Sequence, residues 1–168
     1  MKSTSAHGPN PEKATFRVEE TPAVPWLGLF FGAIAMVPFV LGAAGIWILN
    51  DGASAWAARL TVIWGGAILS FLAGVRRGLS FRTPGGEDVA QMTTMLWLFL
   101  LALASLVLPW LLASLGLLIV GYASIGVLDP VAASYREAPL FFKRLRPVQM
   151  LVPVASLAVI VVHIVARG

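Results

Sequence analysis

Residues 91–128 have the sequence QMTTMLWLFLLALASLVLPWLLASLGLLIVGYASIGVL, in which no position is charged. As one straight helix this segment would be about 57 Å long, whereas the hydrocarbon core of a bilayer is only about 30 Å thick. The segment is therefore predicted to form two membrane-spanning helices. Pro109 lies near its middle and places the turn between Met92–Leu108 and Trp110–Leu128, because proline breaks a continuous helix.

Three further apolar segments are predicted to span the membrane: Val24–Leu49, Trp56–Val75 and Val148–Val165. Only 12% of the chain is charged, 58% is hydrophobic and the mean hydropathy is +0.85, whereas soluble domains carry about 25% charged residues. The fold class is thus predicted as all-α, an integral membrane bundle of five transmembrane helices over residues 24–168. Residues 1–23 are polar and proline-containing, which predicts a disordered cytoplasmic tail.

The distribution of basic residues supports five spans and fixes an orientation. Five spans place the tail, the loop after the second span and the loop after the fourth on one side of the membrane. That side then holds ten of the twelve basic residues: Lys2, Lys13, Arg17, Arg76, Arg77, Arg82, Arg136, Lys143, Arg144 and Arg146. By the positive-inside rule we expect a multi-pass protein of the bacterial inner membrane, with its N-terminus in the cytoplasm and its C-terminus in the periplasm.

Small residues recur every fourth position along the second span and predict a helix-packing face. Helices in lipid associate by close packing, which small side chains allow. The predicted face comprises Gly66, Ser70, Gly74 and Gly78. We expect the second span to be the centre of the bundle, and a leucine at Gly74 to hold two helices apart.

Residues for catalysis, ion coupling or metal binding are scarce. The chain has no cysteine, and no carboxylate lies inside a predicted span, since Asp51 and Asp129 fall at span ends. His163 has no second histidine near it in the membrane and is predicted to be an interfacial polar residue rather than a ligand. We therefore predict no catalytic, cofactor-binding or metal-binding residues, and a protein that is not an enzyme.

The basic loops could contact anionic partners. Arg76 and Arg77 are interpreted first as topology anchors, and otherwise as part of a site for an anionic lipid headgroup or a partner protein. The full set predicted for such contacts is Arg76, Arg77, Arg82, Lys143 and Arg144. The aromatic and basic run Leu140–Arg146 is predicted to be a short helix in the plane of the interface. Because the positive charge belongs to loops that face lipid, we expect no nucleic-acid partner.

The segment Trp64–Leu79, WGGAILSFLAGVRRGL, resembles the signature of an uncharacterised membrane-protein family, a domain of unknown function. That family occurs in proteobacterial inner membranes and has a mitochondrial inner-membrane relative. The resemblance implies five helices, and Pro38-Phe39 in the first span also fits it. Two positions differ from the usual signature: Ala73 replaces a glycine, and Arg77 stands where a tryptophan is common.

The leading functional hypothesis is a non-catalytic accessory or assembly subunit of a larger inner-membrane complex, in the respiratory chain or in photosynthetic electron transport. The small size, the small-residue face and the distribution of the family favour it. The alternative is a small transporter or a lipid- or quinone-binding protein, which a cavity lined by Ser70, Tyr122 and Arg76 would favour. An enzyme comes third. Expected partners are anionic membrane lipids and other membrane-protein subunits.

Overall fold

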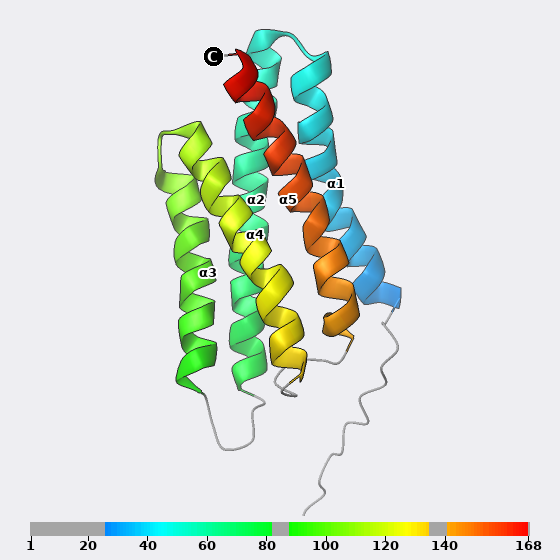
Figure 1. Ribbon diagram of the computed structural model, residues 1–168, viewed down its shortest axis with the longest axis vertical. Coiled ribbons are helices and arrows are strands. Elements are labelled where there is room, and N and C mark those ends of the chain that lie inside the picture. The colour runs from blue at the N-terminus through cyan, green and yellow to red at the C-terminus, as the bar shows by residue number, and fades with distance from the viewer. Residues whose placement is uncertain (1–25, 82–87, 135–140, 168) are drawn as a thin grey trace, which may run out of the picture.

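Five helices packed side by side and alternating in direction make up the computed structural model (Figure 1), which describes residues 26–81, 88–134 and 141–167. The predicted disordered tail and Arg82 lie outside these residues. The helices are α1 (Trp26–Ile48), α2 (Asp51–Ser80), α3 (Val89–Val107), α4 (Leu111–Ser134) and α5 (Phe142–Arg167). Each is long and apolar enough to cross a membrane, so the prediction of a five-helix multi-pass protein is confirmed.

The turns between helices follow from local sequence. The side chain of Asn50 caps α2 by accepting a hydrogen bond from the Ala53 amide at 3.0 Å, which satisfies a backbone donor that the first helical turn leaves free. The predicted turn at Pro109 is also confirmed. Leu108 has an extended backbone, as is usual for a residue before proline, and this ends α3.

The prediction for the polar stretch between the last two spans is wrong. It places Asp129 at the start of a loop, but α4 continues past Asp129 and past Pro130 to Ser134. Residues 142–146 do not form a separate interfacial helix; they are the first turns of α5. Hydropathy detects where a segment leaves the hydrocarbon, whereas a helix continues as long as its backbone bonds are satisfied.

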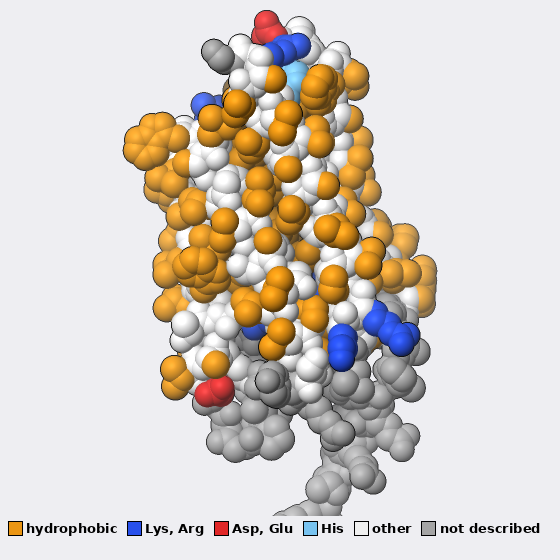
Figure 2. All heavy atoms as spheres, in the orientation of Figure 1, with side chains coloured by type: hydrophobic (Ala, Val, Ile, Leu, Met, Phe, Trp, Pro, Cys, Tyr) orange, Lys and Arg blue, Asp and Glu red, His pale blue; other side chains and the backbone are white. Residues whose placement is uncertain are grey.

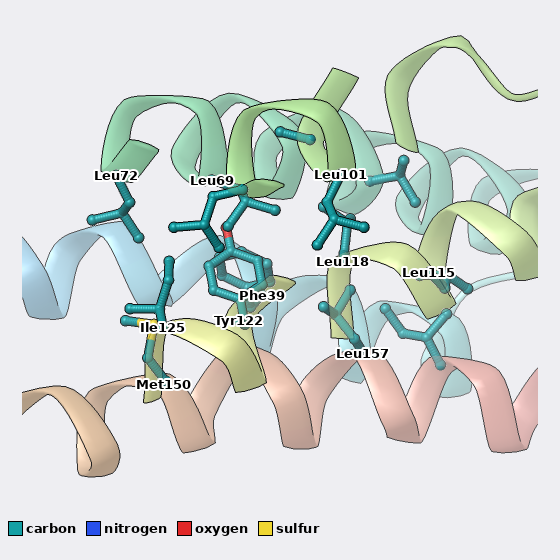
Figure 3. Packing of buried hydrophobic residues seen from close by; sticks show 14 of the residues in the cluster. Phe39, Leu69, Leu72, Leu101, Leu115, Leu118, Tyr122, Ile125, Met150 and Leu157 are labelled. Carbon is teal, nitrogen blue, oxygen red and sulfur yellow. The ribbon is translucent and has the colours of Figure 1, made fainter. Parts of the chain in front are cut away.

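The core lies between the helices and takes buried side chains from all five of them, including Leu101 of α3 (Figure 3). Tyr122 of α4 is fully buried, and its hydroxyl donates a 2.7 Å hydrogen bond to the Gly65 carbonyl of α2. Its ring meets Phe39 of α1 edge to face, with centroids 5.3 Å apart, a favourable aromatic geometry. The second helix, predicted as the centre, shares that place with α4: α2 packs against α1, α3 and α4, while α4 packs against α2, α3 and α5.

The outer surface separates apolar and charged side chains. In Figure 2 hydrophobic side chains cover the middle of the visible face, and charged side chains gather at its two ends. The basic end contains the start of α1, the end of α2, the start of α3, the end of α4 and the start of α5 (Figure 1). We call the other end, where Arg59 and Arg167 lie, the far end. This band of apolar surface between charged ends matches a bilayer.

Candidate functional site

Three charged side chains from three helices meet at the basic end of the bundle. Arg76 of α2 donates from Nε to Asp129 Oδ1 of α4 at 2.9 Å, and its Nη2 lies 2.7 Å from the same oxygen. Arg146 of α5 has its Nε 3.0 Å from the other oxygen, Oδ2. The side chains of Arg76, Asp129 and Arg146 are only 13%, 7% and 11% exposed. We call this cluster the charge lock.

Neighbouring residues fix the position of Arg146. Its guanidinium stacks on the Phe142 ring, 4.4 Å from the centroid, and its Nη1 donates to Gln149 Oε1 at 3.4 Å. Gln149 in turn lies against Gly32 of α1, where a Cβ atom would collide with the side-chain amide. A glycine at position 32 therefore lets α5 approach α1 closely enough to place Arg146 over Asp129.

The charge lock connects three helices of the bundle. Both carboxylate oxygens of Asp129 face guanidinium groups, so the negative charge of Asp129 is balanced within the bundle. A charge is expensive to place in a membrane unless it has a partner, and removing one member of a buried ion pair typically costs about 3–5 kcal/mol. The pairing ties α2 and α5 to α4, and no short loop joins α2 to either of the other two helices.

The structure separates the basic residues that we predicted to contact lipid or partners. Arg76 points inward to the charge lock. Arg77 lies over the Phe81 ring at 4.4 Å and contacts Ser80 and Met92. Lys143 and Arg144 are exposed at the start of α5, where they could meet an acidic surface.

The four residues of the predicted packing face do not all lie on the same side of α2. Gly66 is buried against Leu106 of α3, whose Cγ lies 2.6 Å from where a Cβ would be, and Ser70 is half-buried. Gly74 and Gly78 are exposed, and no atom lies within 4 Å of the position that a Cβ would take at either residue. The prediction that Gly74 contacts another helix of this chain is wrong. Four residues advance the helix by about 400°, so a stripe at this spacing turns by about 40° per step.

The open part of α2 is itself a face. Ala67, Phe71, Gly74 and Gly78 are all exposed, and steps of four, three and four residues keep them on one side of the helix. We call these four residues the outer glycine face. Its small residues leave a shallow strip of backbone that another helix could approach, while Phe71 forms one edge.

The sequence-based prediction of the site does not include Asp129 or the pairing of Arg146. Asp129 precedes Pro130 and a polar segment, which resembles the start of a loop, and Arg146 stands among other loop cations. One signal is present in the sequence: Asp129 is a single acid bordering an uncharged span in a region rich in arginine, and charges at membrane depth pair with one another.

Two further polar side chains inside the spans, His163 and Thr61, have structural contacts. The His163 ring is buried and meets Trp47 edge to face at 4.6 Å between centroids. Thr61 donates to the Ala57 carbonyl of its own helix at 2.8 Å. Across the part of the chain that the structure describes, no three His, Asp or Glu side chains are grouped so that they could hold a metal ion.

Comparison with known proteins identifies the family of the chain. Residues 24–162 match the family described as "Protein of unknown function (DUF3429)". No curated protein matches the chain, and no solved structure does either. Since the match covers most of the chain, the protein belongs to this family.

Proposed function

We propose that this member of the DUF3429 family is a non-catalytic accessory or assembly subunit that packs against a larger inner-membrane complex of respiratory or photosynthetic electron transport. The observation that carries the proposal is the outer glycine face. Gly74 and Gly78 are open on a helix whose other sides pack against α1, α3 and α4. Glycine lowers helix stability relative to alanine. The presence of two exposed glycines in α2 is therefore explained if a second helix packs against them.

Exposed positive charge at the same end of the bundle as Gly78 favours a partner with acidic loops. Lys143 and Arg144 are exposed at the same end of the bundle as Gly78. Arg76 is already paired with Asp129, so the partner contact is assigned to Lys143 and Arg144 instead. A helix from a larger complex would pack on the outer glycine face, and its acidic loop would lie near these two cations.

A non-catalytic role fits the way in which the polar side chains are used. Asp129 is neutralised by two arginines. Tyr122, which could line a transport cavity with Ser70 and Arg76, is fully buried and donates to Gly65. These contacts occupy Tyr122 and Arg76, two of the three groups expected to line a central transport pathway, so the accessory role is favoured over a transporter.

We also propose that the basic end faces the cytoplasm of a proteobacterial cell, as the family resemblance and the positive-inside rule suggest. Alkaline phosphatase fused after Gly168 should then be active, because the C-terminus would reach the periplasm. An inactive fusion made in normal amount would contradict this orientation.

The accessory role is tested by native electrophoresis of the tagged protein, expressed at its natural level and extracted in mild detergent. We expect it to migrate with a complex far larger than 17.9 kDa, and mass spectrometry of that band identifies the partner. Migration as a monomer or a small homo-oligomer, while respiratory complexes remain intact, would contradict the proposal.

A further inference from the structure

A cavity of about 680 Å³ opens at the far end of the bundle, between α2, the end of α3 and the start of α4. This is within the size range of ligand-binding cavities in proteins, which is about 300–1,000 Å³. Its wall is mostly apolar and includes Trp56, Val62, Leu106 and Leu111. An apolar hollow on the surface of a membrane-spanning bundle faces acyl chains, so its natural occupant is part of a lipid.

Arg59 is the charged residue on the wall of this cavity. The side chain is exposed, and no acceptor for its guanidinium is found among the described residues. Arg167, the other arginine of the far end, differs in this respect, since its Nη1 lies 3.0 Å from Asp51 Oδ1. Among the described side chains of the far end, this ion pair balances Arg167 with Asp51 and leaves Arg59 as the cation without an acidic partner.

The position of Arg59 matters as much as its charge. It lies eight residues after Asp51, the first residue of α2, which places it about 12 Å along the helix from that end. A cation at this depth reaches toward the headgroups along its aliphatic stem. The amino end of α4, where Leu111 lines the cavity, adds the partial positive charge of a helix start.

We infer that this cavity is a binding site for one anionic phospholipid, which places its phosphate on Arg59 and one acyl chain along the apolar wall. Guanidinium groups suit phosphate oxygens, and the wall supplies the apolar contact. The site is at the opposite end of the bundle from the charge lock and does not depend on the accessory role.

The test is native mass spectrometry of the purified protein with dioleoyl phosphatidylglycerol or with dioleoyl phosphatidylethanolamine. The wild type should retain one phosphatidylglycerol at least fivefold better than phosphatidylethanolamine. Arg59→Gln should reduce the binding of phosphatidylglycerol to the level of phosphatidylethanolamine. Arg167→Gln is the matched control, because it removes the same charge from the same end but outside the cavity, and it should bind like the wild type.

A second variant tests the apolar wall without changing charge. Ala55 is exposed and lines the cavity, so Ala55→Trp fills the space and should lower phosphatidylglycerol binding several-fold. Thermal unfolding in detergent should match wild type for both Ala55→Trp and Arg59→Gln. Millimolar glycerol 3-phosphate should not displace the lipid, since it lacks an acyl chain.

Three results would overturn the inference. They are wild-type binding by Arg59→Gln, an equal loss in Arg59→Gln and Arg167→Gln, and wild-type binding by Ala55→Trp. The first would exclude Arg59 as the phosphate ligand, the second would show a general charge effect, and the third would exclude the cavity.

Discussion

At the scale of single residues, Asp129 is the residue that connects three helices, whereas the predicted packing face does not. It accepts from two arginines that come from α2 and α5. A carboxylate placed between two guanidiniums leaves a net charge of +1 at the basic end, which anionic headgroups can balance. The predictable part of this site was Arg76; its partners depend on which helix ends meet, and a single sequence does not contain that information.

Asp129→Asn should strongly destabilise the protein, because it leaves two buried guanidiniums without a counter-charge. The expected loss is about 3–5 kcal/mol, measured as a lower unfolding temperature in mild detergent. Asp51→Asn is the control: Asp51 is also paired with an arginine, but its side chain is 95% exposed, so little change is expected.

A triple variant tests whether the charges of the charge lock are needed for stability or for function. Replacing Arg76, Asp129 and Arg146 by Met, Leu and Met removes the charges together, and should recover most of the stability that Asp129→Asn loses. If Asp129→Asn unfolds at the wild-type temperature, the charge lock does not hold the helices together.

At the scale of elements, the helices were predictable from hydropathy, while their faces were not. The spans and the turn at Pro109 followed from the length of uncharged sequence compared with bilayer thickness. The small-residue stripe was assigned to one face because its members are four apart, yet Gly66 faces α3 and Gly74 faces outward. Which neighbour a stripe meets depends on the tertiary arrangement, which the spacing alone does not contain.

Two leucine substitutions in α2 test which of these glycines packs inside the bundle. Gly66→Leu should destabilise the bundle by about 1–3 kcal/mol, the usual cost of overpacking, because Leu106 occupies the space that the new side chain needs. Gly74→Leu should unfold at the wild-type temperature or slightly higher, since nothing lies within 4 Å of the added carbon. Equal destabilisation by the two would mean that both glycines pack inside the bundle.

At the scale of the whole molecule, the five-helix architecture was predictable because two kinds of sequence information agree. Hydropathy counts the spans, and the basic residues select an odd number of them. The cavity at Arg59 was not predictable, because its wall combines α2, α3 and α4, and because Arg59 by itself resembles an arginine that reaches to the interface. A binding site formed between helices becomes visible only once the helices are packed.

The central claim is that the outer glycine face docks a larger membrane complex, and native electrophoresis of paired variants tests it most directly. Gly74→Leu with Gly78→Leu adds two bulky side chains to the face. Gly28→Leu with Gly116→Leu adds the same bulk at two other glycines that have nothing within 4 Å. We predict that the first pair leaves the large complex and migrates as the free protein with its stability retained, while the second pair stays with the complex. Co-migration of both pairs with the complex, as for the wild type, would contradict the claim.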